Sequence, residues 1–325
     1  MRACVIGVGV IGNVHLKALK QLNYDVIGVC DIDVDKAKNA ICKYDLTATA
    51  YGDYKQMLLD LKPDVVHICT PHYLHAEMII FALNNNVNTL CEKPLCIKTE
   101  DIPKIIDAEV NSKAILGVCH QNRYNGENLF AKDYLKDKEV VTAHGQTVWN
   151  RNDGYYNQAA WRGKWDTEGG GVLINQALHT LDLVQWFMGE PKNLTATISN
   201  LHLKDVIEVE DTAFILMDNG KKFSFFATTA SGGDFPVSLD FYLKDGKVLS
   251  VTNGKVYLDG DLLFNATTDT FLGKACYGTG HVALIADFYN HAATGSKFDI
   301  DGQEASKVIK IILASYKSNT NIVSL

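Results

Sequence analysis

The sequence predicts an α/β protein of two domains, in which a doubly wound parallel sheet is followed by an α+β domain with a large, mostly antiparallel sheet. The first third of the chain alternates short apolar runs with helix-length amphipathic stretches. Later segments alternate apolar and polar residues and meet at Asn-Gly and Asp-Gly pairs. The 325 residues are enough for two domains that each bury a core.

The first domain is expected to span residues 1–119. Its apolar runs lack internal alternation, as strands buried on both faces of a sheet require. Regular repetition of strand and helix implies parallel strands with right-handed crossovers. The expected strands are Ala3–Ile6, Val26–Cys30, Val65–Cys69, Val87–Cys91 and Ile115–Cys119, with helices that begin near Ile11, Asp35, Asp53, Tyr73 and Thr99.

The second domain is expected to span residues 120–325, with strands from about Val140 onward. Asn-Gly and Asp-Gly pairs supply the positive φ angles of tight hairpins, so neighbouring strands should run antiparallel. One long helix is expected to interrupt the sheet and two more to close the chain, and these last two can pack back onto the first domain. The hairpin pairs begin at Asn219, Asp245, Asn253 and Asp259, and the helices are Gly171–Met188, His281–Ala293 and Gly302–Ser318.

Composition and charge exclude several classes of protein. The 47% hydrophobic and 21% charged residues are typical of a soluble globular chain. A net charge of −7 argues against nucleic acid or an anionic membrane surface as a partner. No apolar run approaches the roughly 20 residues of a membrane span. The start of the chain shows no secretory signal pattern, so a cytoplasmic protein is expected.

The eight cysteines are interpreted as reduced structural thiols. Five of them lie in or beside apolar runs, where thiols behave as small hydrophobes. There is no Cys-x-x-Cys pair, so neither a metal site nor a disulfide framework is expected.

The segment from Gly7 to Gly12 has the pattern Gly-x-Gly-x-x-Gly, directly after a strand and at the start of a helix. In that context the pattern predicts a dinucleotide-binding Rossmann domain. Gly7 permits the tight turn, Gly9 lets the backbone approach a pyrophosphate, and Gly12 allows close helix packing. The N–H groups at the helix start, including those of Val10 and Ile11, would bind the phosphates.

Asp31 completes the predicted cofactor site. It ends the second strand, 19 residues beyond Gly12, where a carboxylate can accept hydrogen bonds from the ribose hydroxyls of NAD. Its charge would repel a 2′-phosphate, and after Asp31 no Arg or Lys occurs before Lys36, so NAD is favoured over NADP. The alternative is that Asp31 only forms a turn or a helix cap. The adjacent Ile32 is assigned to the same cofactor-binding set.

Three further motifs resemble those of the glucose–fructose oxidoreductase, inositol dehydrogenase and rhizopine-catabolism (Gfo/Idh/MocA) family, and the resemblance spans essentially the whole chain. The first is Thr70-Pro71-His72-Tyr73-Leu74-His75, at the carboxyl end of a strand. The resemblance implies that Thr70, Pro71 and His72 lie along NAD. His75 is grouped with them, although it is expected to cap or pack at the turn.

The second motif is Glu92-Lys93-Pro94, just after the strand Val87–Cys91. In the family that it resembles, this lysine reaches the reacting carbon of a sugar or cyclitol. Oxidation of an alcohol removes the hydroxyl proton as hydride leaves, and Lys93 is the expected acid–base group. Glu92 and Lys93 are also assigned to the cofactor side, and Pro94 is a candidate for a cis peptide bond.

The third motif runs from Glu168 to Asp182 and resembles Gly-Gly-x-x-x-Asp-x-x-x-His of the family. A helix would place Asn175, His179 and Asp182 on one face, toward a cleft. His179 is the second expected catalytic residue, and a packed core histidine is the alternative. Where the family has aspartate this chain has Asn175, which cannot accept a proton and can only orient a substrate hydroxyl.

Two shorter segments supply further candidates. Tyr155 and Tyr156 precede Trp161-Arg162-Gly163-Lys164-Trp165, an aromatic loop suited to the apolar faces of sugars. Trp161, Arg162 and Tyr156 are assigned to substrate, with a subunit or domain contact as the alternative. The segment from His120 to Tyr124 resembles the family's crossover into the cleft, which assigns Gln121 to the cofactor and Arg123 to substrate or structure.

The favoured function is that of an NAD-dependent dehydrogenase or reductase acting on a sugar, cyclitol or sugar derivative. One alternative is a relative that recycles tightly bound NAD while it hydrolyses or epimerises a sugar. Another is a nucleotide-binding sensor without catalysis, against which Lys93 and His179 argue. A mostly antiparallel sheet can leave one face uncovered, so a homodimer or homotetramer is expected.

Overall fold

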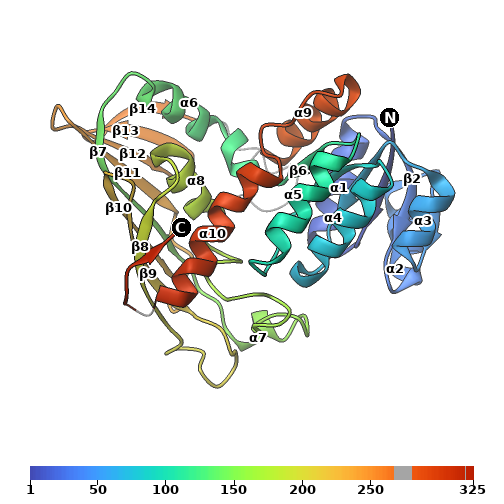
Figure 1. Cartoon of the computed structure of the whole chain (residues 1–325), viewed down its shortest axis with the longest axis horizontal. Coiled ribbons are helices and arrows are strands. Elements are labelled where there is room, and N and C mark those ends of the chain that lie inside the picture. Colours follow the sequence, from blue (N-terminus) through green and yellow to red (C-terminus); the bar gives the residue numbers. More distant parts are fainter. Residues whose placement is uncertain (267–279, 319) are drawn as a thin grey trace. The chain divides into compact units, whose positions relative to one another are not determined.

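The computed structural model of the chain describes residues 1–266, 280–318 and 320–325, and it forms two compact units (Figure 1). The first unit comprises Met1–Gln121 with the described part of residues 269–306. The second comprises the described part of residues 122–268 with the described part of 307–325.

The first unit is built on a six-stranded parallel sheet in the order β3-β2-β1-β4-β5-β6. The chain reverses its direction of winding between β1 and β4, as in a doubly wound sheet. The five expected strands are confirmed, and the sequence missed the short β3, which contributes only three residues. The strands are β1 (Arg2–Ile6), β2 (Asp25–Cys30), β3 (Thr49–Tyr51), β4 (Val65–Ile68), β5 (Asn88–Cys91) and β6 (Leu116–Val118).

The helices of this unit begin within two residues of the expected positions. Asp33 and Asp53 cap α2 and α3, since the carboxylate of each accepts a hydrogen bond from the second N–H of its helix. The helices are α1 (Val10–Gln21), α2 (Val34–Tyr44), α3 (Tyr54–Leu61), η1 (His72–Leu74), α4 (His75–Asn84) and α5 (Asp101–Asn111).

A late segment of the chain also belongs to the first unit. Phe288 of helix α9 (Gly280–Thr294) packs against Gly117 of β6. Phe298, in the segment after this helix, packs against the same glycine. The amide of Val118 donates a hydrogen bond to the carbonyl of Ile300. Residues 280–306 thus pack with the parallel sheet, an arrangement that the sequence left open for the C-terminal helices.

The second unit contains a nine-stranded sheet in the order β14-β13-β12-β11-β7-β10-β9-β8-β15. Every described pair is antiparallel except β7 with β10. All four predicted hairpins are present, with positive φ angles at their turn glycines. The strands are β7 (Val140–Val148), β8 (Asn193–Ser199), β9 (Thr212–Asp218), β10 (Lys222–Thr228), β11 (Ser238–Leu243), β12 (Val248–Thr252), β13 (Lys255–Leu258), β14 (Asp261–Asn265) and β15 (Val323–Ser324).

Helices of the second unit pack on this sheet. Val184 of α8 lies against Gly145 of β7, where a larger residue would collide with it. Phe130 of α6 stacks on Phe264 of β14, with ring centroids 4.9 Å apart. The helices are η2 (Gln121–Tyr124), which starts at the division between the units, α6 (Gly126–Leu135), α7 (Asp153–Tyr156), α8 (Leu178–Met188) and α10 (Gly302–Ser318), which continues from the first unit into the second.

The expected helix Gly171–Met188 begins later than predicted, at Leu178. Gly169 and Gly170 have φ angles of +85° and +146°, which are incompatible with a right-handed helix. Turns follow, and the amide of Ala177 bonds the carbonyl of Val172, five residues earlier. This bond to the fifth preceding residue departs from the α-helical pattern, and the regular helix begins only after these turns.

Among the described residues, no helix combines the length and the apolar character that crossing a membrane would require.

Candidate active site

The glycine loop after β1 has the three properties that the sequence predicts. Gly7 has a φ angle of +87°, and a Cβ there would lie 2.6 Å from the carbonyl oxygen of Cys69. A Cβ on Gly12 would overlap the carbonyl oxygen of Gly7. A Cβ on Gly9, by contrast, would meet no protein atom within 4 Å. Side chains at positions 7 and 12 would thus collide with protein atoms, whereas the space beside Gly9 is open. That space fits a pyrophosphate bound against the backbone.

The N-terminus of α1 is suited to a phosphate. Gly9 is the N-cap residue and makes no side-chain capping bond. The first turn contains no acidic residue. The N–H groups there and the positive end of the helix dipole favour an anion.

Asp31 lies at the edge of the same loop. Its Oδ2 accepts a hydrogen bond from the amide of Val8 at 3.0 Å, and its Oδ1 accepts one from the amide of Asp33 at 3.0 Å. Asp33, and not Asp31, caps α2. A carboxylate has about four lone-pair sites, so Asp31 retains capacity for further donors.

Two large apolar side chains beside the loop are exposed. Val10 is 67% exposed and Ile32 is 96% exposed. Isolated exposed apolar residues are common on protein surfaces. These two flank Gly9 and Asp31 in sequence, where a bound ligand would cover them.

The segment after β4 is held by a buried histidine. His75 Nδ1 lies 2.7 Å from the carbonyl oxygen of Pro94, and its Nε2 lies 2.9 Å from that of Thr70. Burial lowers the pKa of His75 despite these hydrogen bonds. His75 therefore packs at the turn, as expected, and joins the segment after β4 to the segment after β5. His72 is also buried, whereas Thr70 and Pro71 are half-buried.

The turn after β5 presents a half-buried lysine between buried neighbours. The peptide bond between Lys93 and Pro94 is cis. Glu92 is 4% exposed, and its Oε2 accepts a hydrogen bond from the amide of Lys93 at 3.2 Å. Lys93 is the one residue of Leu90–Cys96 that is not buried. The motif thus buries its carboxylate and leaves its lysine accessible.

Two histidine side chains also lie within hydrogen-bonding distance of the Glu92 carboxylate. His15 Nε2 lies 2.9 Å and His281 Nε2 lies 3.3 Å from Glu92 Oε1. Burial alone would raise the pKa of Glu92, but the hydrogen bonds from these histidines hold it well below the usual value. Neither histidine was predicted from the sequence. The position of His15, three residues after Gly12 on the buried face of α1, was a signal, whereas nothing local singled out His281.

In the second unit, Asn175 and His179 are the two residues of the run 168–185 that are not buried. The Nδ2 of Asn175 donates hydrogen bonds to the carboxylate of the buried Glu168 and, at 3.3 Å, to the hydroxyl of Tyr155. The two predicted polar positions are therefore the ones that reach the surface of this unit. They do so from a turn and from the first residues of α8, not from one regular helix.

Asp182, which was expected on the same face, is instead buried. Its carboxylate pairs with Arg123, with Nε–Oδ2 and Nη2–Oδ1 distances of 2.8 and 2.6 Å. Both side chains are at most 6% exposed. The prediction that Asp182 faces a cleft is wrong. Of the two roles left open for Arg123, this ion pair is the structural one.

The aromatic segment separates into a core residue and a surface group. Tyr156 is 4% exposed and packs with Leu203, Ile207 and Val209. The guanidinium of Arg162 lies 4.2 Å from the ring centroid of Tyr155. This packing favours Tyr155 over the predicted Tyr156 as a substrate-contacting residue.

The remaining candidates of the crossover and the aromatic loop differ in exposure. Trp161 and Arg162 are half-buried, whereas Gln121 is 3% exposed.

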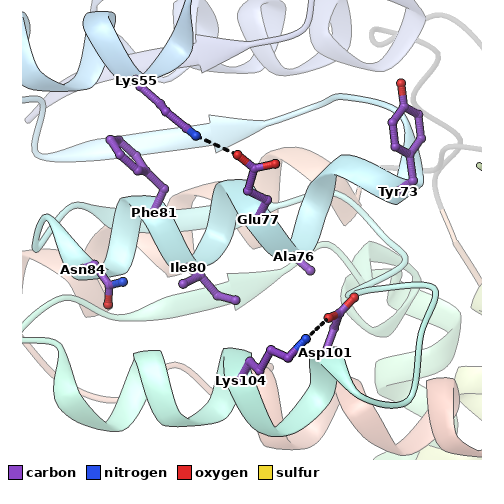
Figure 2. A pocket seen from close by; sticks show the side chains of 9 residues that line it. All are labelled: Lys55, Tyr73, Ala76, Glu77, Ile80, Phe81, Asn84, Asp101 and Lys104. Atoms are coloured by element: carbon purple, nitrogen blue, oxygen red, sulfur yellow. Dashed lines mark hydrogen bonds and ion pairs between the residues drawn. The ribbon is translucent and has the colours of Figure 1, made fainter.

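A groove of 410 Å³ lies elsewhere on the first unit, between α3, α4 and α5 (Figure 2). Lys55 pairs with Glu77 at 2.8 Å, and Lys104 pairs with Asp101 at 2.9 Å. These carboxylates already neutralise both lysines. The groove includes none of the predicted site residues.

Comparison with known proteins gives two family matches. Residues 1–120 match the model described as oxidoreductase family, NAD-binding Rossmann fold, and residues 138–249 match the Gfo/Idh/MocA C-terminal domain. Among relatives, the chain is 29% identical over 196 residues to inositol 2-dehydrogenase of Salmonella typhimurium, which covers 58% of this chain and 55% of that protein. It is 28% identical over 200 residues to D-glucoside 3-dehydrogenase of Escherichia coli, with coverages of 59% and 55%. The matches thus span little more than half of each relative.

Among solved structures, the WlbA dehydrogenase of Chromobacterium violaceum in complex with NADH and UDP-GlcNAcA is similar throughout. Its TM-score is 0.87 at 26% sequence identity, with coverage of 100% of this chain and 96% of that chain. The two family models cover most of the present chain, in the order of its two predicted domains. The chain therefore belongs to the Gfo/Idh/MocA oxidoreductase family, and its first unit carries that family's NAD-binding Rossmann domain.

Proposed function

We propose that this protein is an NAD-dependent dehydrogenase or reductase that acts on a CH–OH group of a sugar, cyclitol or sugar derivative. The observation that carries the proposal is the carboxyl edge of the parallel sheet. Gly7, Asp31, Thr70 and Lys93 follow β1, β2, β4 and β5, which are neighbours in that sheet. Ligands of open α/β sheets bind at this edge, where the winding reverses.

NAD is the proposed cofactor in preference to NADP. Asp31 places a carboxylate at the loop, and a 2′-phosphate would meet it with repulsion. The proposed cofactor-contacting set comprises Gly7, Gly9, Val10, Ile11, Gly12, Asp31, Ile32, Thr70, Pro71, His72, Glu92, Lys93 and Gln121. Because the carboxylate of Glu92 is occupied by histidines, its proposed contact with NAD is through the backbone.

When bound, NAD supplies a carbon that accepts or returns a hydride. Lys93 is proposed to take the hydroxyl proton during oxidation and to return it during reduction, with support from His179. Asn175 is proposed to orient a substrate hydroxyl, since an amide does not act as a base. Trp161 and Arg162, joined by Tyr155, are proposed to contact the substrate.

A sugar-like substrate is supported by the names of similar proteins. The relatives act on inositol and a D-glucoside, and the WlbA complex holds UDP-GlcNAcA. The test is a panel of cyclitols, sugars and sugar acids with NAD or NADH, followed through the absorbance of the reduced nicotinamide. Turnover of at least one polyol is expected, and failure of the whole panel in both directions would contradict the proposal.

Tight retention of NAD would instead favour the alternative of redox-neutral chemistry. That alternative predicts purified protein whose NAD survives dialysis and whose sugar turnover consumes no added NAD.

Self-association is proposed through the uncovered face of the nine-stranded sheet. Side chains alternate along β9, where Phe214 and Leu216 are 57% and 50% exposed while their neighbours are buried. Val141 of β7 and Tyr242 of β11 are also exposed. A homodimer or homotetramer that covers this face would remove the apolar residues from water.

A cytoplasmic location is likewise proposed. It is supported by the seven cysteines among the described residues, none of which forms a disulfide.

A further inference from the structure

A buried chain of four polar side chains leads through the first unit to the turn that carries Lys93. The hydroxyl of Tyr289 lies 3.0 Å from Nε2 of His67. His67 Nδ1 lies 2.8 Å from His15 Nδ1, and His15 Nε2 lies 2.9 Å from Oε1 of Glu92. None of the four residues is more than 4% exposed. They come from α9, β4, α1 and the turn after β5, so folding alone brings them together.

The hydrogen-bonding capacity of each group assigns a direction to this chain. Glu92 is a carboxylate and can only accept, so His15 must carry its proton on Nε2. If this is the only ring proton of His15, its Nδ1 accepts, which requires the proton of His67 to be on Nδ1. Burial lowers the pKa of His67 well below its usual value, so His67 is neutral. Its Nε2 accepts from Tyr289, which burial keeps protonated by raising its pKa.

Three thiols at the end of the parallel sheet interact with the charge of Glu92. Thiols of Cys69, Cys91 and Cys119 face it from the carboxyl ends of β4, β5 and β6. Burial, together with the charge of Glu92, raises the pKa of each thiol well above its usual value, so all three are neutral. His281 reaches Glu92 from α9, and burial lowers its pKa. The amide of Lys93 donates to the second carboxylate oxygen.

We propose that Tyr289, His67 and His15 are positioning residues whose directional hydrogen bonds hold Glu92 as an oriented carboxylate beside Lys93. The arrangement supplies one fixed negative charge next to the lysine and clamps its backbone amide. That charge favours the ammonium form of Lys93 and offsets the effect of burial on it. The consequence for catalysis rests on the proposed role of Lys93, whereas the direction of the chain does not.

A metal site is the main competing interpretation, because the ligand atoms of His15, Glu92 and His281 lie within 4.8 Å of one another. The separations of 2.9 and 3.3 Å from Glu92 are those of hydrogen bonds. A zinc ion with bonds of about 2.0–2.1 Å would displace the Nε2 proton of His15 and force it away from Glu92. The hydrogen-bonded chain satisfies the same atoms without an ion.

The first test measures the histidine tautomers of the full-length protein by long-range ¹⁵N–¹H correlation spectroscopy at neutral pH. His67 is expected as the neutral Nδ1–H form and His15 as the neutral Nε2–H form. Signals are assigned with His67→Gln and His15→Gln variants. A charged imidazolium or an Nε2–H form of His67 would overturn the proposed direction. A stoichiometric metal, measured by elemental analysis of protein purified without chelator, would overturn it in favour of the metal site.

The second test reverses the direction of the hydrogen bonds that link these four side chains. In Glu92→Gln, the amide can donate to His15 Nε2, so His15 should carry its proton on Nδ1 and His67 on Nε2. The tautomer of His67 is thus expected to change, although residue 92 does not touch it. Glu77→Gln, which removes an exposed carboxylate of α4 in the same unit, is the matched control and should leave both tautomers unchanged. An unaltered His67 in a folded Glu92→Gln protein would contradict the proposal.

The effect on Lys93 is measured without a substrate, through the pH dependence of its acylation by acetic anhydride, read by mass spectrometry. Loss of the negative charge in Glu92→Gln should move the midpoint to lower pH by roughly half a unit or more. Glu77→Gln should not move it. An unchanged midpoint in Glu92→Gln would show that Glu92 does not act on Lys93. If the tautomers and midpoint behave as expected but Lys93→Ala retains turnover, the proposed function fails and the chain stands.

Discussion

The Nε2 atom of His15 lies 2.9 Å from Oε1 of Glu92, and both side chains are buried. His15 lies on α1, directly after the glycine loop, while Glu92 immediately precedes Lys93. The contact therefore joins the segment proposed to bind the pyrophosphate to the segment proposed to move a proton. Substitutions in the first segment should therefore weaken cofactor binding, whereas substitutions in the second should lower turnover.

Lys93→Ala should abolish turnover with little change in NADH affinity. General acid–base groups contribute about 10²–10⁴-fold, so the fall in kcat should lie in that range. Steady-state kinetics and NADH fluorescence titration measure the two quantities. The exposed Lys98 provides the control, since Lys98→Ala should change neither. Parallel losses of affinity and turnover in Lys93→Ala would contradict its proposed role as the acid–base group.

Asp31→Ala should weaken the preference for NAD over NADP, because it removes both a ribose acceptor and the charge that repels a 2′-phosphate. Asp31→Asn should have a similar effect while it retains one acceptor for the amides of Val8 and Asp33. Dissociation constants of NADH and NADPH give the preference. Asp35→Ala alters an exposed carboxylate of α2 and serves as the control. Unchanged preference in both Asp31 variants would refute the assignment.

Gly9→Ala should weaken cofactor binding, whereas Gly12→Ala should destabilise the fold. A Cβ on Gly9 meets open space, so the variant should unfold like the parent but bind NADH at least about tenfold more weakly. A Cβ on Gly12 overlaps the backbone of Gly7, so this variant should lose about 1–3 kcal/mol of stability. Thermal unfolding without cofactor and NADH titration distinguish them. Normal NADH affinity in Gly9→Ala would show that the pyrophosphate lies elsewhere.

The stability of the protein should depend on Glu210. Burial raises its pKa to about 7, although the amides of Leu173 and Gly171 donate to it. The folded state therefore holds a proton on Glu210 up to about pH 7 that the unfolded state releases near pH 4.5. The stability that this bound proton contributes to the folded state is fully present below pH 4.5 and is lost as the pH rises to about 7.

Glu210→Gln should remove that contribution, which amounts to roughly 3 kcal/mol at most. Urea unfolding at pH 5 and pH 7.5 measures the difference between the parent and the variant. Glu208→Gln, which alters an exposed carboxylate two residues away, should follow the parent. Equal pH dependence in the parent and Glu210→Gln would mean that Glu210 titrates normally in the folded protein.

Phe214→Glu should dissociate the proposed oligomer, because it places a charge among the apolar residues of the uncovered sheet face. Size-exclusion chromatography with light scattering gives the mass of each species. Val110→Glu, at a 77% exposed position on α5, tests whether any such charge has the same effect. A monomeric parent, or an oligomer that survives Phe214→Glu, would exclude this face as the interface.

Most of the first unit could be predicted because its signals are local. A buried parallel strand is a continuous apolar run, and each predicted strand before residue 120 appears within two residues of its expected bounds. Gly7 and Gly12 could be assigned roles because the positive φ angle of Gly7 and the contact of Gly12 with the carbonyl of Gly7 arise within the loop itself. The short β3 escaped, because three residues carry too little pattern.

The errors in the second unit arose where local pattern and packing disagree. Asn175, His179 and Asp182 have helical spacing, but Asn175 lies in a turn before α8, and the carboxylate of Asp182 pairs with Arg123. Tyr155 and Tyr156 are adjacent and chemically identical, so only burial against Ile207 and its neighbours distinguishes the core residue from the surface one.

By itself, the sequence determined the α/β class and the glycine loop before the first helix, and it predicted Asp31, Lys93, Asn175 and His179 as site residues, because each is encoded in a run of adjacent residues. Only the tertiary structure decided that Glu92 is a buried carboxylate held by His15 and His281. Those partners are 77 and 189 residues away along the chain. Hydrogen bonds between such distant residues depend on where folded elements meet, which no local periodicity records.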